Sequence, residues 1–275
     1  MTTTLTILGC GSSGGVPRIG PNWGACDPAE PRNRRRRASV LIERHGEGNG
    51  NTSSGERGRT RVLVDTSPDI REQLIAANVG RLDAVVWTHD HADHTHGIDE
   101  LRVYALNAQA RMPVYFDAVT GAGITSRFDY CFRPSASGAY PAILKPHDIA
   151  PLQPVTLGGK GGLVSLTPFA QDHGEIASLG YRIGNLAYSP DISGVPEASL
   201  PMLKDLDMWI VDGLKPTPHP AHFSVGQALE WIERLKPRRA VLTHLHVDLD
   251  YDALKRKLPA HVEPAFDGMV IDVDA

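Results

Sequence analysis

The chain has 275 residues, of which 41% are hydrophobic, and its 28 Lys and Arg residues against 32 Asp and Glu residues give a formal net charge of −4. The length allows one large domain or two small ones, and the hydrophobic content suffices for a buried core, which excludes intrinsic disorder as a global description. The slightly acidic balance excludes extended nucleic acid and an anionic membrane as partners bound by bulk electrostatics.

The sequence predicts neither a signal peptide nor a membrane span. Residues 1–15 carry no basic region followed by a long apolar stretch, and nowhere in the chain is there a run of about 18 apolar residues. The three cysteines, Cys10, Cys26 and Cys131, are odd in number and widely spaced, which favours reduced thiols over a disulfide framework. We therefore expect a cytoplasmic protein without a membrane partner.

In the first half of the chain, short apolar runs alternate with amphipathic stretches. The first run ends in a glycine-rich segment, residues 9–17, which favours a tight turn; the alternative is a close approach of its backbone to a ligand or a neighbouring strand. Residues 45–59 hold five glycines and no apolar side chain, so we expect a flexible hairpin tip there. Strands are predicted at 5–8, 38–42, 60–65, 84–88 and 113–116, and helices at 68–79, 97–109 and 119–130.

The second half continues the alternation. Ser224 and Gln227 have the spacing of a capping box and predict the start of a helix. Strands are predicted at 163–169, 178–183, 186–189, 208–212, 240–243 and 270–273, and helices at 196–206, 224–235 and 251–258. Because strands and helices alternate in both halves and no linker divides them, we predict one layered α/β domain over residues 1–275, with helices on the outer faces of the sheets.

Residues 88–94 read THDHADH and follow a predicted buried strand. Three imidazoles and two carboxylates within six positions would be costly to bury together, whereas a bound cation accounts for them. A rigid turn after the strand can direct His89 and His91 to one ion and Asp93 and His94 to another. The alternative, a solvated polar loop, does not explain the apolar strand that leads into it.

Three further candidate ligands lie downstream, each where a predicted strand ends. They are His173, Asp191 and His244, and each one alone could be an ordinary loop residue. Ligand sites of α/β folds lie at strand ends. Together the three supply what a two-metal centre still lacks: a third imidazole for each ion and a carboxylate to bridge them.

This order of residues resembles the ligand order of the metallo-β-lactamase fold hydrolases. Four further segments are similar to the phosphodiesterase of the carbon–phosphorus lyase pathway: GCGSSGGVP at 9–17, GIDELR at 97–102, Thr243-His244, and FDGM at 266–269. The resemblance covers nearly the whole chain. It implies a four-layered αββα sandwich and a site for two divalent metal ions, zinc or manganese.

The resemblance also implies a role for each site residue. His89, His91 and His173 would hold one ion, Asp93, His94 and His244 the other, and Asp191 would bridge both. Asp65 would accept a hydrogen bond that orients the metal-binding loop, whereas we expect Asp90 to be solvated. His222 matches the position of a proton-donating histidine, although it could also be a surface histidine beside the predicted helix; Asp93 and His222 are the predicted catalytic residues. His219 is expected at the surface, and His246 has no assigned role.

Two regions near the N-terminus, residues 17–27 and the arginines at 32 and 34–37, bear on metal content and substrate binding. The related phosphodiesterase is expected to hold a structural zinc ion on several cysteines and a late histidine. Here residues 17–27 offer only Cys26, and Val247 stands in place of the histidine, so we expect that site to be absent. Arg32 and the arginines at 34–37 predict a solvated entrance to the next strand; alternatively, one or two of them bind a substrate phosphate.

The sequence thus predicts a dinuclear metal-dependent phosphodiesterase. Its substrate would be a small, cyclic or linear, nucleotide or sugar phosphodiester, attacked by a hydroxide that bridges the metal ions, and a homodimer is compatible with the sequence. Three different functions remain open: a hydrolase of carbonyl esters, lactones or thioesters with the same fold, a tRNA 3′-processing endonuclease, and a pyrroloquinoline quinone biosynthesis-type protein.

Overall fold

Apolar runs rich in valine, isoleucine and leucine form the strands of two facing sheets. The computed structural model describes residues 2–46 and 58–273, and these form two seven-stranded sheets. In spatial order the first comprises β14 (Val270–Asp272), β1 (Thr2–Gly9), β2 (Ser39–His45), β3 (Arg59–Val64), β4 (Ala84–Val86), β5 (Met112–Phe116) and β6 (Leu144–Asp148). The second comprises β13 (Val262–Pro264), β12 (Arg239–Thr243), β11 (Met208–Asp212), β10 (Leu186–Ser189), β9 (Ile176–Ile183), β8 (Gly162–His173) and β7 (Val155–Gly159).

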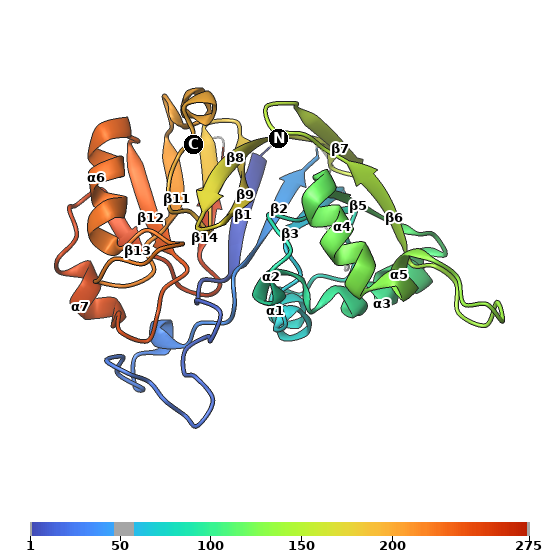
Figure 1. Ribbon diagram of the computed structural model, residues 1–275, viewed down its shortest axis with the longest axis horizontal. Helices are drawn as coiled ribbons and strands as arrows, with labels where there is room; N and C mark the ends of the chain where they lie inside the picture. The colour runs from blue at the N-terminus through green and yellow to red at the C-terminus, as the bar shows by residue number, and fades with distance from the viewer. Residues whose placement is uncertain (1, 47–57, 274–275) are drawn as a thin grey trace.

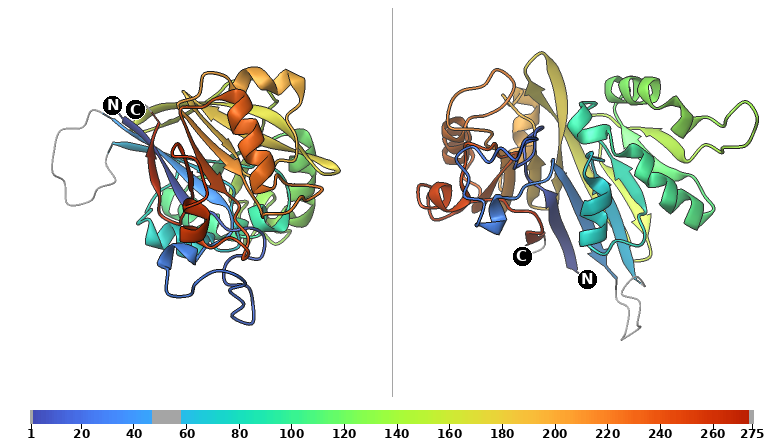
Figure 2. Two further views of the ribbon diagram at one scale, coloured as in Figure 1. Left: turned by 90° about the vertical axis from the view of Figure 1, so that its left-hand side faces the viewer. Right: turned by 90° about the horizontal axis from the view of Figure 1, so that it is seen from below.

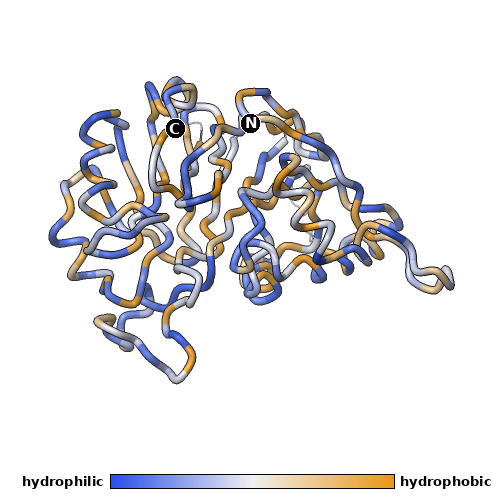
Figure 3. The backbone as a smooth tube through the Cα atoms, viewed as in Figure 1, coloured by the Kyte–Doolittle hydropathy of each residue, from blue (hydrophilic) through white to orange (hydrophobic). Residues whose placement is uncertain are grey.

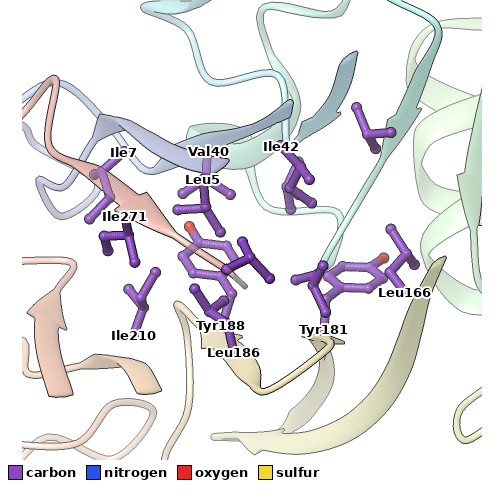
Figure 4. Packing of buried hydrophobic residues seen from close by; sticks show 14 of the residues in the cluster. Leu5, Ile7, Val40, Ile42, Leu166, Tyr181, Leu186, Tyr188, Ile210 and Ile271 are labelled. Carbon is purple, nitrogen blue, oxygen red and sulfur yellow. The ribbon is translucent and has the colours of Figure 1, made fainter. Parts of the chain in front are cut away.

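The two sheets pack face to face through a continuous apolar core. Leu5 and Val40 of the first sheet and Tyr188 and Ile210 of the second are each fully buried in this core (Figure 4). Strands β10 and β11 are buried along their whole length, because helices or loops cover the face that does not meet the other sheet. Removing this apolar surface from water is the main term that holds the sheets together.

Helices cover the outer face of each sheet. They are α1 (Ile70–Ala76), α2 (Ala92–Thr95), α3 (Leu101–Ala108), α4 (Ala118–Arg127), α5 (Asp129–Phe132), α6 (Val225–Leu235) and α7 (Tyr251–Lys255), with 3₁₀ turns η1 (Pro31–Asn33), η2 (Ile98–Glu100) and η3 (Glu197–Leu203). Helices α1 to α5 lie on one flank and α6 and α7 on the other (Figures 1 and 2). Hydrophilic and hydrophobic stretches alternate along α6 (Figure 3), and its apolar side packs on the second sheet. The predicted four-layered αββα sandwich is therefore confirmed.

Some predicted elements differ in type or length. The helix predicted at 196–206 is the 3₁₀ turn η3, which has Pro201 inside it; proline cannot donate the backbone hydrogen bond that an α-helix needs. The strand predicted at 84–88 ends at Val86, because the amide of Thr88 donates to the Asp65 carboxylate. The predicted tip at 45–59 falls largely on residues 47–57, outside the described residues. None of the described helices is long and apolar enough to cross a membrane.

The strand directions bring the candidate site residues to one edge of the sandwich. β1, β3 and β4 run in the same direction in the first sheet, and β8, β10, β11 and β12 share a direction in the second. Polar residues stand at or just after the carboxyl ends of six of these strands: Asp65, His89, His173, Asp191, Asp212 and His244. Carboxyl ends of parallel strands are the usual ligand-binding edge of α/β sheets.

Candidate metal centre

The structure brings all seven predicted metal ligands together. Among the described residues, four groups have ligand-type atoms within 4.8 Å of one another: His89, His91 and His173; His89, His94 and Asp191; Asp93, His94 and His244; and His173, Asp191 and His222. The first and third are the two triads that the resemblance implies. Their roles as ligands stay a prediction, but the geometry that the prediction requires is present.

Asp191 lies between the two triads. Its Oδ1 is 3.1 Å from His94 Nε2 and 3.3 Å from His244 Nδ1, and its Oδ2 is 3.7 Å from His173 Nε2 and 3.9 Å from His89 Nε2. The carboxylate is thus surrounded by imidazoles of both triads. This is the position that a bridging ligand requires.

The buried atoms of this cluster fit a cation. His89 Nε2, His94 Nε2, His244 Nδ1 and Asp191 Oδ1 are buried and form no hydrogen bond within the described part of the chain. A buried polar atom without a partner costs about 1–3 kcal/mol, and several in one place are rarely tolerated. Lone pairs that converge without donors are satisfied by metal ions, and imidazole with carboxylate suits zinc and manganese.

Hydrogen bonds on the opposite ring nitrogens orient the histidines. His94 Nδ1 donates to Asp65 Oδ2 at 2.7 Å, and His173 Nδ1 donates to the Ala221 carbonyl at 2.6 Å, so each Nε2 is left as an electron-pair donor. Burial lowers the pKa of His89 well below its usual range and that of His244 to about 4. The neutral imidazole, the form that binds metal, is therefore favoured at these two rings, whereas at His94 burial is outweighed by the charges of Asp191, Asp93 and Asp65, which raise its pKa well above its usual range.

Asp65 connects the ends of two adjacent strands. Besides His94, it accepts hydrogen bonds from the Thr88 amide at 2.8 Å and the Thr88 hydroxyl at 2.9 Å. Asp65 has φ 64° and His244 has φ 58°, in the left-handed region that non-glycine residues rarely adopt. Such strain persists where the surrounding contacts determine the conformation, as at functional sites. The structure places Asp65 where the resemblance puts the orienting carboxylate.

His222 lies beside the triads but belongs to neither. Its Nδ1 is 2.6 Å from Asp212 Oδ2, and its ring stacks on His244 with 4.9 Å between centroids. Burial alone lowers the pKa of His222, but the hydrogen bond and charge of Asp212 outweigh this and raise it. From the sequence, Asp212 is predicted only as the last residue of a strand. A carboxylate at the end of a fully buried strand is, however, a pattern that indicates a candidate site residue.

One expectation about an individual residue is wrong: Arg35, expected at a solvated strand entrance, is only 1% exposed. Asp90 forms an ion pair with Arg127 and stays partly exposed. His219 is of intermediate exposure, with its ring 5.1 Å from that of His222, and both line one cavity.

The glycine-rich segment and the arginine run pack against each other. A Cβ at Gly9 would stand 2.1 Å from the Arg37 carbonyl, so the approach of the two backbones requires glycine there. Arg36 donates to Asp267, which also accepts from the Cys10 amide, and Arg37 pairs with Asp69. Arg32 is likewise paired, with Glu30 and Asp252. Most guanidiniums of the run are therefore engaged within the protein.

The N-terminal segment that was expected to lack a structural zinc site contains a small apolar cluster. Cys26 packs there with Val16 and Val247, and Trp23 lies against them. The Cys26 thiol contacts the carbonyls of Val247 at 3.3 Å and Leu249 at 3.4 Å. These contacts hold the N-terminal segment against the loop that follows His244.

Comparison with known proteins agrees with this arrangement. The family model described as "Beta-lactamase superfamily domain" matches residues 60–245. The solved structure of a "New Diphosphatase from the PhnP Family" is 33% identical with a TM-score of 0.82, over 98% of this chain and 97% of that one. Zn²⁺-bound PqqB from Methylobacterium extorquens has the same fold, at 19% identity and a TM-score of 0.70 over 98% and 99% of the two chains.

A curated relative named octanoyltransferase, from Porphyromonas gingivalis, is 31% identical over 271 residues. The match includes 98% of this chain but 51% of the relative. The chain therefore spans about half the length of this relative. Its name is that of the longer protein.

We expect the purified protein to hold about two divalent ions per chain, because the seven side chains make two sites with room for solvent or substrate. Asp191→Ala removes the carboxylate between the triads and should loosen both ions. Elemental analysis after gel filtration measures the content. The matched control is Asp90→Ala, which lies in the same motif but pairs with Arg127 and should retain both ions. Two tightly held ions in Asp191→Ala would refute the bridging position.

Asp65→Asn should weaken metal binding about 10- to 100-fold, the usual cost of losing a carboxylate that orients a ligating histidine. Asparagine tolerates the left-handed conformation at this position, so the substitution removes charge without straining the backbone. Competition with a chromogenic chelator measures the affinity. An affinity equal to that of the unmodified protein would mean that His94 needs no such support.

Proposed function

The chain belongs to the β-lactamase superfamily, and from this premise we propose that it is a metal-dependent phosphodiesterase of small nucleotide or sugar phosphodiesters. The observation that carries the proposal is the His222–Asp212 pair beside the ligand cluster. An alkoxide is a poor leaving group that departs readily only when protonated. A histidine whose pKa is raised by a buried carboxylate, next to the metal ligands, is suited to supply that proton.

Each group in the site has a defined task. Two divalent ions in this site would lower the pKa of a water molecule and neutralise charge on the phosphoryl oxygens. His89, His91 and His173 would hold one ion and Asp93, His94 and His244 the other, with Asp191 between them. His222 holds its transferable proton at Nε2, because Nδ1 is engaged with Asp212. As the water oxygen–phosphorus bond forms and the phosphorus–alkoxide bond breaks, the leaving oxygen keeps the electron pair and takes that proton.

Hydrolysis of a diphosphate is a second candidate. It is supported by the 33% identity to a structure named a diphosphatase over nearly the whole of both chains. The chemistry is closely related: the same attack at phosphorus breaks a P–O–P bond, and the leaving group is a phosphate. Such a leaving group depends less on a proton donor than an alkoxide does.

Two other functions have less support. They are cleavage of tRNA and acyl transfer through a cysteine thiol, which the name of the octanoyltransferase relative brings into consideration. The net charge of −4 gives no general attraction for tRNA. Acyl transfer through a thiol requires an accessible thiolate. Cys10, Cys26 and Cys131 are all buried, and burial raises the pKa of each. Metal-dependent hydrolysis of a carbonyl ester, lactone or thioester uses the same ions, so a choice of substrates must separate it from phosphodiester hydrolysis.

The test is a substrate screen on metal-loaded protein whose ion content has been measured. The substrates are bis(p-nitrophenyl) phosphate, 2′,3′- and 3′,5′-cyclic nucleotides, p-nitrophenyl phosphate, p-nitrophenyl acetate and a chromogenic β-lactam. We expect turnover of phosphodiesters with monoesters accumulating as product. Turnover of the β-lactam or of the carbonyl ester without phosphodiester turnover would replace the proposal by carbonyl hydrolysis.

His222→Ala should keep its metal ions and its fold, because His222 is outside both triads. Its rate on an alkyl or ribosyl phosphodiester should fall about 100-fold or more, whereas the rate on a p-nitrophenyl ester, whose leaving group needs no proton, should fall much less. Steady-state kcat/KM on both substrates measures the difference, with His261→Ala, at an exposed position, as the control. Equal losses on both substrates would indicate phosphate binding by His222, and loss of metal would make it a ligand.

A further inference from the structure

We propose that Arg18, Lys215 and Ser12 form an anion subsite next to the metal centre, which receives the second phosphoryl group of a diphosphate-containing substrate. The proposal rests on the proposed action of the metal centre on phosphoryl groups. It adds the part of the protein that would select the substrate.

The subsite is a cavity of about 290 Å³ that shares His222 and His244 with the metal centre. Arg18 and Lys215 line it, and no carboxylate does among the described residues. A cavity with cations and without acids in its walls attracts an anion. This volume is at the lower end of small-molecule sites, so it suits two linked phosphoryl groups, with the remainder of the substrate outside.

Arg18 is held in place by a histidine and not by a carboxylate, so its positive charge is not neutralised by an ion pair. Its Nη2 donates to His246 Nε2, and His246 Nδ1 lies 2.9 Å from Asp248 Oδ2. Because the guanidinium can only donate, Nε2 is the acceptor, so the ring positions the guanidinium and leaves it cationic. A Cβ at Gly14 would stand 3.0 Å from Arg18 Nε, so the absent side chain lets Arg18 lie along the glycine-rich segment.

Lys215 is placed by three backbone hydrogen bonds around it. The Leu214 amide donates to the Phe223 carbonyl at 2.9 Å, the Val225 amide to the Lys215 carbonyl at 3.0 Å, and the His246 amide to the Leu214 carbonyl at 3.0 Å. These bonds join the segment that carries Lys215 to the segments that carry His222 and His246. The backbone of Lys215 therefore belongs to the same rigid surroundings as the proposed proton donor, and Lys215 lines the cavity beside it.

Ser12 supplies the independent observation that points to a ligand. It is 3% exposed and lines the cavity, and its hydroxyl finds no hydrogen-bond partner in the described ranges. A buried hydroxyl is normally paired, and a phosphoryl oxygen would accept its hydrogen bond. A guanidinium and a hydroxyl from the N-terminal segment and an ammonium from the segment around Lys215 suit the tetrahedral oxygens of a phosphoryl group.

The experiment compares two competitive inhibitors of bis(p-nitrophenyl) phosphate hydrolysis by the metal-loaded full chain. AMP carries one phosphoryl group, and α,β-methylene-ADP carries two that cannot be separated by hydrolysis. With free divalent ion kept in excess, we expect α,β-methylene-ADP to inhibit at least about tenfold more tightly than AMP, since a charge-assisted hydrogen bond is worth that much. The reporter substrate has no second phosphoryl group.

Arg18→Met and Lys215→Met should each reduce this preference about tenfold while changing kcat/KM for the reporter less than about threefold. Arg18→Lys should restore part of it. The controls are Arg133→Met and Lys204→Met, which alter exposed cations outside the cavity and should retain the full preference. Because Arg18 and Lys215 lie on separate segments, parallel losses in both variants would not come from one folding defect.

Equal inhibition by the two nucleotides in the unmodified protein would overturn the subsite, as would a preference that survives in both variants, which would indicate metal chelation by the inhibitor. Loss of metal in Arg18→Met would mean that Arg18 supports the metal centre instead. Failure of the proposed function has a separate signature. The reporter would not be hydrolysed, while direct calorimetric titration of both nucleotides would still measure the subsite.

Discussion

A buried carboxylate surrounded by imidazoles is the constraint on which the site depends. Asp191 is 1% exposed, and both of its oxygens face histidines of the two triads. Taking so many polar atoms out of water is unfavourable unless each finds a partner, and here several ring nitrogens find none in the described protein. The fold therefore concentrates a desolvation cost at one edge, which bound cations would offset. The two packed sheets are rigid, and this rigidity keeps the clustered side chains from moving apart.

That rigidity comes from connections across the molecule as well as from the core. Asp267, near the C-terminus, accepts from the amides of Cys10 and Arg36, so the last loop holds both the glycine-rich segment and the arginine run. The Leu245 amide in turn donates to the Cys10 carbonyl at 2.7 Å, directly after His244. Three of the four segments similar to the related phosphodiesterase, 9–17, 243–244 and 266–269, are thus connected around Cys10.

The sequence predicted the central strands and the side chains that the fold gathers at the candidate metal centre, because burial on both faces and clustered histidines leave strong local patterns. The strands it missed, β6, β7 and β13, lie at sheet ends, where one partner strand and solvent leave no clear apolar pattern. Helix ends were also misplaced, since side-chain contacts determine them. Arg18 and His246 could not be found from spacing alone, because they are 228 residues apart and only the fold brings them together. Asp212 did leave a local signal, as a carboxylate at the end of a fully buried strand ten residues before His222.

Two histidine–carboxylate pairs border the same cavity, and the comparison shows how surroundings divide their roles. In each, a carboxylate lies against Nδ1: Asp212 for His222, and Asp248 for His246. Beyond His222 stand Asp191 and the other acidic ligands, whose charges help to raise its pKa. Beyond His246 stands Arg18, and burial together with that positive charge lowers its pKa. One ring is therefore suited to carry a proton and the other to accept from a guanidinium. In the proposed function the same kind of local pair would serve acid catalysis at one wall of the cavity and charge placement at the other.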